Sequence, residues 1–270
     1  MASMPSRRTQ WQRTAASSGS ASLRPAVLTD FDDTAAVQNV AELLLKRFGD
    51  PTWEQVRLRF RAGELTLKQY QEITFRNVQA DRATMQAYVR QHATLRPYFR
   101  ELWDHCAAAG IPMAIVSHGL DFYIEALLEK EHLTGVPVYA VHTRFDPEGI
   151  GYEYRYTYPG QEHQGNSKGW VVDHYRQHGY HVLYAGDGRS DLEAAAKADL
   201  VFAHSTLAEE CRQRGIPFRP FQDFQDVLLA VQEFSPDGEG SHSGLTREIP
   251  PSSLLQRGVR GDFVLSLIHI

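Results

Sequence analysis

Two short acidic clusters contain the side chains of this chain that are best suited to chemistry. Asp30 and Asp32 are separated by one residue, and Asp187 and Asp191 lie far downstream. In an extended segment, residues two apart project to the same side, so Asp30 and Asp32 are expected to face together. Oxygen ligands without histidine or cysteine favour a hard cation, and Mg2+ bound in this way suits phosphoryl chemistry. We therefore expect a magnesium site formed by Asp30, Asp32, Asp187 and Asp191.

A second group of residues could bind the phosphate itself. Ser117 follows an apolar run and precedes a helix-like segment, as do the backbone amides of His118 and Gly119. Hydrogen bonds and the helix dipole attract anions to such a position. Lys168 would add a positive charge. These four residues are the predicted phosphate-binding groups.

Together these groups indicate transfer of a phosphoryl group to Asp30. An aspartyl-phosphate intermediate divides one difficult displacement into two easier ones. Asp32 would protonate the leaving alkoxide and then activate the water that hydrolyses the intermediate. Each motif alone is weak, because Asp-x-Asp pairs also occur on solvated loops and a single lysine usually lies on the surface. Their order along the chain is what favours catalysis.

Alternating strand and helix signals place these residues at one edge of a sheet. Short apolar runs predict strands over 26–29, 113–116, 136–141, 181–185 and 200–203. Helical spacing is found over 37–48, 97–109, 121–130, 168–178, 191–197 and 224–234. This alternation predicts an α/β fold with a parallel sheet covered on both faces, and ligands bind beyond the carboxyl ends of such strands.

Between the first two strands the chain contains only helical signals, over 53–60, 67–78 and 84–92. An insert of this length exceeds the usual loop after a strand. We therefore expect residues 36–95 to form an all-helical cap.

Tyrosines at every second position mark a further segment. Tyr152, Tyr154, Tyr156 and Tyr158 would lie on one face of a β-ribbon. Packing within a hairpin is favoured over a substrate surface for these phenols.

Composition excludes several classes of protein. The 270 residues carry a formal net charge of -5, so no global positive field would attract nucleic acid or an anionic membrane. No apolar run approaches the length of a membrane span. Cys106 and Cys211 are far apart in sequence and give no support to a disulfide framework. A cytoplasmic protein without nucleic-acid or membrane partners is the expectation.

The two ends of the chain differ from the middle. Residues 1–24 lack acidic side chains and are expected to be a disordered leader. Residues 235–270 are rich in Gly, Ser and Pro over much of their length and are expected to be a disordered tail. Within it, residues 265–270 resemble the translation of a sequencing adapter.

The ordered motifs resemble a known family. Residues 28–34 (LTDFDDT), 115–119 (IVSHG), Lys168 and 185–191 (AGDGRSD) are similar to the four motifs of haloacid dehalogenase-like phosphatases. The resemblance implies a Rossmann-like core over 25–35 and 96–234. The helical cap would be inserted after the first motif.

The resemblance also implies roles for individual residues. Asp30 would be the nucleophile and Asp32 the general acid and base, while Ser117 and Lys168 contact the phosphoryl group. Magnesium would be bound by Asp30, the Asp32 carbonyl and Asp187, with Asp191 in support. One departure is visible, because Asp33 stands where glycine is commonest in the family.

The substrate implied is a small phosphorylated metabolite. Residues 117–124, 63–66 and 199–203 resemble the methionine-salvage branch, whose members hydrolyse 2-hydroxy-3-keto-5-methylthiopentenyl-1-phosphate. Phosphoserine phosphatases are the alternative. They typically place Glu nine residues after the nucleophile and Arg in the cap, whereas this chain has Asn39 and Thr74. With both charge partners missing, phosphoserine would be bound less well.

A phosphate-binding regulator without turnover is an alternative from a different class. Receiver domains also combine an acidic pair, a phosphorylated Asp, a Ser or Thr and a Lys. Their acidic pair precedes the strand of the acceptor, whereas Asp30 and Asp32 share one loop here, so the enzyme is favoured.

Overall fold

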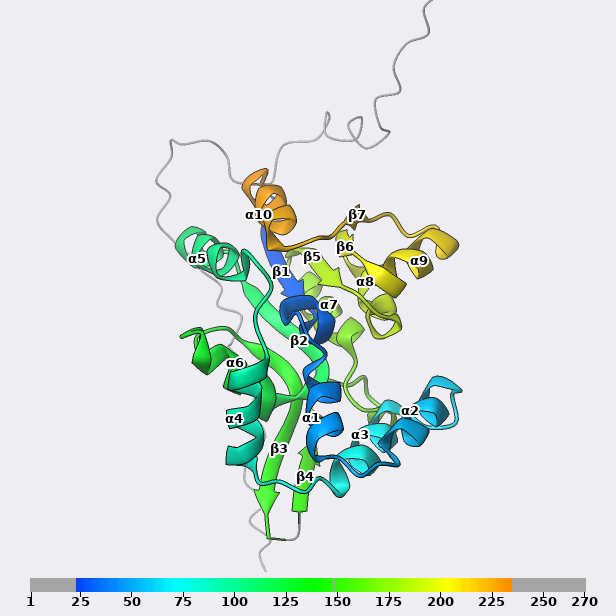
Figure 1. Cartoon of the computed structure of the whole chain (residues 1–270). Helices are drawn as coiled ribbons and strands as arrows, with labels where there is room; N and C mark the ends of the chain where they lie inside the picture. The colour runs from blue at the N-terminus through cyan, green and yellow to red at the C-terminus, as the bar shows by residue number, and fades with distance from the viewer. Residues whose placement is uncertain (1–22, 148, 235–270) are drawn as a thin grey trace, which may run out of the picture.

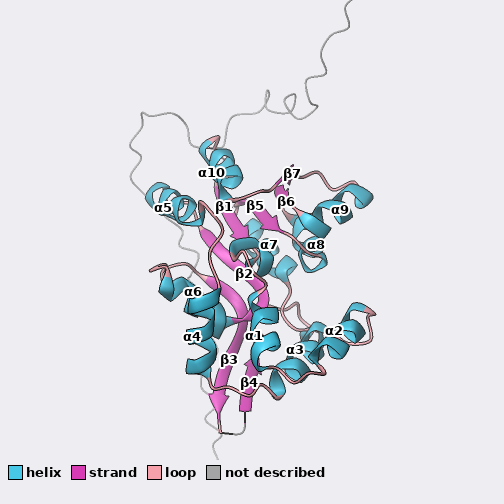
Figure 2. Cartoon of the chain, viewed as in Figure 1, coloured by secondary structure: helices cyan, strands magenta, loops and turns pink. Residues whose placement is uncertain are grey.

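The computed structural model describes residues 23–147 and 149–234, which form an α/β fold around one sheet (Figures 1 and 2). The seven strands are ordered β4-β3-β2-β1-β5-β6-β7. They are β1 (Pro25–Thr29), β2 (Met113–Leu120), β3 (Val138–Asp146), β4 (Gly149–Glu153), β5 (His181–Gly186), β6 (Leu200–Ala203) and β7 (Arg219–Pro220). Only β4 runs antiparallel to its neighbour. The predicted parallel α/β sheet is therefore confirmed.

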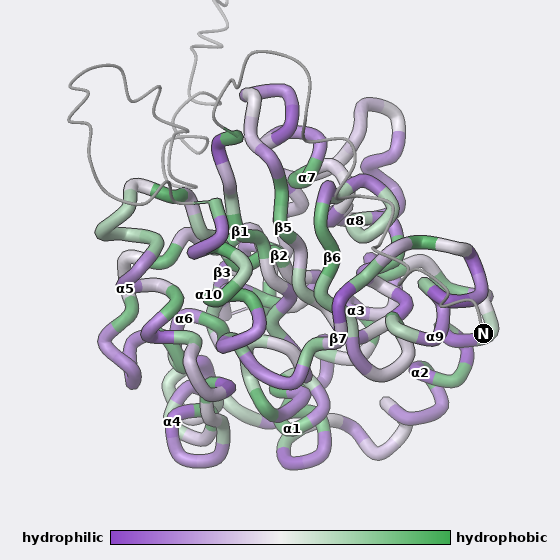
Figure 3. The backbone as a smooth tube through the Cα atoms, turned by 90° about the horizontal axis from the view of Figure 1, so that it is seen from above, coloured by the Kyte–Doolittle hydropathy of each residue, from purple (hydrophilic) through white to green (hydrophobic). Residues whose placement is uncertain are grey.

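Alternating side chains of the central strand enter two separate cores. Val27 of β1 belongs to one cluster, and Ala26 and Leu28 belong to the other. Figure 3 shows the apolar strands β1, β5 and β6 running between the helices. The helices are α5 (Phe99–Ala109), α6 (Asp121–Lys130), α7 (Lys168–Gln177), α8 (Leu192–Lys197), α9 (Ser205–Arg214) and α10 (Phe224–Gln232). Burial of both sheet faces is the reason why the strands read as continuous apolar runs.

Four helices connect the end of β1 to α5. They are α1 (Val40–Phe48), α2 (Trp53–Arg61), α3 (Leu67–Arg76) and α4 (Arg82–His92). Helix α4 packs on α6, whereas α2 and α3 pack on each other and α3 also contacts β4 (Figure 1). All the elements between residues 40 and 92 are thus helices. An isolated antiparallel β-bridge between Ala36 and Leu95 joins the two ends of this insert.

Several boundaries differ from the sequence-based expectation. Helix α1 begins at Val40 rather than at residue 37, because the Asn39 side chain accepts the Glu42 N–H and caps it. Strand β2 continues to Leu120 with a register shift after Val116, so His118 and Gly119 lie in an irregular strand end and precede α6. Helix α9 and strand β7 were not predicted.

The prediction of a four-tyrosine ribbon face was wrong. Strand β4 ends at Glu153, so only Tyr152 lies within it. Tyr152 and Tyr154 pack against one core cluster, whereas Tyr156 belongs to the other. The chain leaves the sheet after Glu153, and the period of two then no longer describes one face.

Some expectations fall on the ends of the chain. The predicted leader, apart from residues 23 and 24, and the predicted tail lie outside the described residues. Among the described residues, no helix combines the length and apolar character needed to cross a membrane.

Candidate active site

Lys168 joins two of the predicted aspartates at the carboxyl edge of the sheet. Its Nζ lies 2.5 Å from Asp30 Oδ1 and 2.6 Å from Asp191 Oδ1. All three residues are buried. The two carboxylates hold the pKa of the Lys168 ammonium above its usual value despite burial, so the lysine is charged. Residues 30, 168 and 191 are distant in sequence, and the fold brings them together as expected.

Asp191 is saturated by hydrogen bonds from the protein. Besides Lys168, its Oδ1 accepts from the Tyr184 hydroxyl at 2.6 Å. Its Oδ2 accepts from the backbone N–H groups of Asp187 and Gly188. Burial opposes ionisation, but Lys168 and these donors lower the pKa of Asp191 overall. Asp191 is therefore an ionised residue that positions Lys168 and the loop carrying Asp187.

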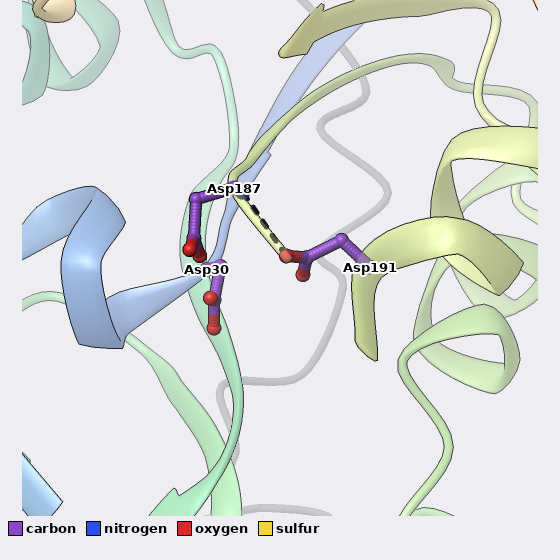
Figure 4. A group of neighbouring side chains, drawn as sticks. All are labelled: Asp30, Asp187 and Asp191. Atoms are coloured by element: carbon purple, nitrogen blue, oxygen red, sulfur yellow. Dashed lines mark hydrogen bonds between the residues drawn. The ribbon is translucent and has the colours of Figure 1, made fainter. Parts of the chain in front are cut away.

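Asp30, Asp187 and Asp191 form the one group of three or more potential metal-ligating residues among the described residues (Figure 4). One carboxylate oxygen from each lies within 4.8 Å of the others. Burial and then the charge of Asp191 raise the pKa of Asp30 and raise that of Asp187 to about 6. Crowded carboxylates of this kind repel one another, and oxygen donors alone suit a hard divalent cation. The residues present therefore fit Mg2+.

The carboxylate of Asp32 lies outside this group. Its Oδ1 accepts from the N–H groups of Val40 and Ala41 at the start of α1, at 2.7 and 3.2 Å. Its Oδ2 accepts from the Tyr123 hydroxyl at 3.1 Å. Burial raises the pKa of Asp32 to about 6, although these donors lower it. An acid with such a pKa can both give and take a proton near neutral pH.

The backbone of Asp33, between Asp32 and Thr34, adopts a conformation that glycine enters most easily. Asp33 has φ 60, in the left-handed region that glycine enters freely and that Asp and Asn tolerate better than most residues. Arg96 donates to the carbonyls of Asp33 and Thr34. Asn39 donates to Asp33 Oδ2 at 2.9 Å. The Asp33 side chain thus contributes a contact that glycine could not make.

Ser117, His118 and Gly119 lie at the same sheet edge as Asp30, because Ile115 on β2 is in register with Thr29 on β1. Gly119 N–H donates to Ser117 Oγ at 2.9 Å. A Cβ on Gly119 would lie 2.0 Å from the Tyr123 hydroxyl oxygen. Glycine is therefore required here because the tyrosine that contacts Asp32 occupies the space.

Sequence reasoning missed several residues that position the site. They are Thr34, which donates to Asp187 Oδ1 at 3.2 Å, together with Arg96, Tyr123 and Tyr184. Tyr184 carried a usable signal, since it is the one hydroxyl in the apolar run 182–185. The partners of Arg96 and Tyr123 depend on how the helices pack and had no local signal.

Comparison with known proteins places this geometry in a family. The model of the haloacid dehalogenase-like hydrolases matches residues 27–196. A 2-hydroxy-3-keto-5-methylthiopentenyl-1-phosphate phosphatase from Exiguobacterium sibiricum is 30% identical over 212 residues, covering 76% of this chain and 95% of the relative. The protein of the same name from Brevibacillus brevis is 28% identical over 211 residues, with coverages of 76% and 93%.

Solved structures show the same fold. A HAD family hydrolase from Salmonella enterica serovar Typhi superposes with a TM-score of 0.58 at 16% identity, covering 78% of this chain and 72% of that one. A phosphoserine phosphatase, solved as a phospho-aspartyl intermediate analogue, gives 0.56 at 17% identity, with coverages of 77% and 99%. With the family model extending over more than half of the chain, the protein belongs to the haloacid dehalogenase-like hydrolases and is a phosphatase.

Proposed function

We propose that this phosphatase is a Mg2+-dependent phosphomonoesterase that acts through an aspartyl-phosphate on Asp30. The observation that carries the proposal is the buried contact of Lys168 with both Asp30 and Asp191, which Asp187 joins in one carboxylate group. Lys168 holds the nucleophile in place and offsets negative charge near an incoming phosphate. A bound Mg2+, held by Asp30 and Asp187 with the Asp32 carbonyl, would reduce repulsion between the nucleophile and the phosphoryl oxygens.

In this proposal the reaction has two steps, which are the formation and the hydrolysis of the aspartyl-phosphate. Asp30 Oδ forms a bond to phosphorus as the ester P–O bond breaks, and Asp32 gives its proton to the leaving oxygen. Asp32 then takes a proton from water, whose oxygen bonds to phosphorus as the Asp30–phosphorus bond breaks. Ser117 and the adjacent amides bind the phosphoryl oxygens. The products are an alcohol and inorganic phosphate.

We propose that residues 36–95 act as a cap over this site. Support comes from Gln71 on α3, whose side-chain Nε2 donates to the carbonyl of His118 in the phosphate-binding loop. The helical insert therefore touches the catalytic core at the residue next to Ser117. Such a contact would help to exclude water during the first step.

The proposed substrate is 2-hydroxy-3-keto-5-methylthiopentenyl-1-phosphate, hydrolysed in methionine salvage, or a closely similar small ester. Relatives bearing that name support it. Asn39 is engaged as the cap of α1 and as a donor to Asp33, and Thr74 donates to the Tyr70 carbonyl. Both side chains are uncharged and are hydrogen-bonded within the protein, so neither would pair with the ammonium or carboxylate of phosphoserine. The proposal includes a cytoplasmic location, supported by two free, buried cysteines.

Phosphate release from a panel of esters tests the proposal. With MgCl2 present, the wild type should hydrolyse para-nitrophenyl phosphate and prefer the methylthiopentenyl ester to phosphoserine. Asp30→Asn should lower kcat by at least about a thousandfold, because the nucleophile is lost. Arg59→Asn, on an exposed part of α2, is the control. Full activity of Asp30→Asn would refute the mechanism, and a preference for phosphoserine would refute the substrate.

A further inference from the structure

Three uncharged side chains present polar atoms between α3 and the catalytic loops. Gln71 is 5% exposed, and its Nε2 donates to the His118 carbonyl. Its Oε1 is buried and receives no hydrogen bond from the described residues. Gln71 therefore offers an acceptor next to the phosphate-binding loop.

The other two side chains flank the phosphate-binding residues. Asn166 is 6% exposed, and its Oδ1 accepts from Tyr156 N–H at 3.1 Å, while its Nδ2 is buried and unpaired within the described part of the chain. His118 forms a hydrogen bond with the Asn166 backbone, and its Nε2 is likewise buried and unpaired. Burial, followed by the charge of Lys168, lowers the pKa of His118 to about 3, so its ring is neutral.

Buried polar atoms in native proteins nearly always have hydrogen-bond partners. Here Gln71 contacts His118, which follows Ser117, and Asn166 lies two residues before Lys168. The ring of His118 in turn hydrogen-bonds the Asn166 backbone, so the three side chains adjoin the residues proposed to bind the phosphate. An acceptor, an amide donor and a neutral imidazole suit hydroxyl and carbonyl groups. They do not neutralise an ammonium or a carboxylate.

We infer that Gln71, His118 and Asn166 form a neutral hydrogen-bonding subsite for the hydroxyl and carbonyl oxygens that adjoin the phosphate of the substrate. The inference rests on the proposed phosphomonoesterase activity and specifies its substrate class. The subsite selects phosphorylated hydroxyketones over simple alkyl phosphates, because an ester without these oxygens leaves the buried groups unpaired.

A pair of three-carbon esters tests the subsite. Dihydroxyacetone phosphate carries a carbonyl and a hydroxyl, and propyl phosphate lacks both. The readout is the ratio of their kcat/KM values with MgCl2 present. In the wild type this ratio should favour dihydroxyacetone phosphate. Gln71→Met, which keeps the length of the side chain, should lower the ratio by about tenfold or more.

Gln86 provides a matched control on another helix of the insert. Its Nε2 donates to the Phe122 carbonyl at 2.9 Å, so it also joins a helix of the insert to the core. Gln86→Met should leave the ratio unchanged. This control separates the loss of a hydrogen bond between the insert and the core from the loss of a contact with the substrate. Melting temperatures of both variants establish that they are folded.

Asn166→Asp tests the subsite independently of α3. It keeps the acceptor for Tyr156 N–H, removes the Nδ2 donor and adds a negative charge. The charge acts on the phosphate of both esters, so the ratio of their kcat/KM values should still fall with the loss of the donor. If Gln71→Met and Asn166→Asp lower both kcat/KM values equally, or neither, the subsite is refuted. If the wild type hydrolyses neither ester nor para-nitrophenyl phosphate, the proposed function itself fails.

Discussion

Single side chains set the position of each reacting group in this site. Asp30 is held by Lys168, whereas Asp32 is held by the start of α1 and by Tyr123. The two aspartates therefore have separate partners, although one residue separates them in the sequence. In the proposed mechanism, this separation would allow one to act as the nucleophile while the other transfers protons.

Gly119 should be intolerant of any side chain. In Gly119→Ala the new Cβ would collide with the Tyr123 hydroxyl and displace the donor to Asp32. We expect kcat to fall by about tenfold or more, since misplaced catalytic groups lose rate steeply. Tyr123→Phe in the same background removes the nearest atom, but it leaves the ring carbon Cζ 2.8 Å from the new Cβ and also removes the donor to Asp32. Steady-state kinetics of the double variant should therefore show no recovery. Wild-type activity of Gly119→Ala would contradict the steric argument.

His118 should make stability depend on pH. In the folded chain the pKa of His118 is about 3, whereas in the unfolded chain it has the ordinary histidine value of 6.5. Below pH 6.5 the unfolded chain therefore binds a proton that the folded chain does not. The contribution of His118 to the free energy of unfolding should therefore decrease by about 1–2 kcal/mol between pH 8 and pH 5.

Urea unfolding at both pH values measures this effect. His118→Gln removes the titrating ring. The difference between the pH dependences of the wild-type and variant free energies of unfolding therefore gives the contribution of His118, because the aspartates with raised pKa values are present in both proteins. His92→Gln, on α4, serves as the control. Parallel pH dependences of wild type and His118→Gln would show that the ring is not held neutral.

At the scale of elements, the start of α1 connects the first motif to the helical insert. Asp32 accepts the N–H groups of Val40 and Ala41, and Asn39 accepts that of Glu42. These groups would otherwise be unsatisfied at a helix start. The helix therefore fixes the orientation of the predicted general acid.

Removing the cap of α1 should affect both stability and catalysis. Asn39→Ala should lower the free energy of unfolding by about 1–2 kcal/mol and reduce kcat, because Asp33 and α1 lose a shared partner. Thr66→Ala removes the capping box of α3 and should reduce stability by about 1 kcal/mol with a smaller effect on kcat. Denaturant unfolding and steady-state kinetics on both variants test the distinction. Equal loss of kcat in the two would show that α1 does not position Asp32.

The helices of the insert should differ in local stability. Helix α2 buries only Trp53, whereas α4 buries Met85 and Val89 and is joined to α6 through Gln86. We expect backbone amides of α2 to exchange with deuterium at least about tenfold faster than those of α4. Hydrogen exchange followed by mass spectrometry on the full chain measures both. Equal protection would show that the insert opens as one unit.

At the scale of the whole molecule, a charge imbalance is concentrated at one sheet edge. Asp30, Asp187 and Asp191 approach one another, and Lys168 is the cation bonded to two of them. Burial makes this crowding more costly, because desolvation raises the pKa values of Asp30 and Asp187. A bound divalent cation should therefore stabilise the folded state.

Magnesium should raise the melting temperature, and Asp187→Asn should abolish the shift. At a concentration ten times Kd, Mg2+ should contribute about 1.4 kcal/mol to the free energy of unfolding. In EDTA, Asp187→Asn should be at least as stable as the wild type, because one crowded carboxylate is gone. Thermal unfolding with MgCl2 or EDTA tests both statements. A wild type indifferent to Mg2+, or a variant that keeps the shift, would contradict the metal site.

The sequence by itself determined the parallel sheet and the residues at its carboxyl edge. Apolar runs and helical spacing act over a few residues, and the acidic motifs directly follow or flank strand ends. Those signals predicted that Asp30, Asp187 and Asp191 share one sheet edge, and the order of the motifs added Lys168 to them. The matching of one family model over 27–196 agrees with that order of motifs.

Only the tertiary structure decided which side chains hold these groups in place. Tyr123 reaches Asp32 because α6 packs on the sheet, and Gln71 reaches His118 because α3 folds back on the core. The Tyr152–Tyr158 repeat was misinterpreted because the chain leaves β4 after Glu153. Contacts between distant segments depend on packing, and packing is a property of the whole fold that local periodicity does not record.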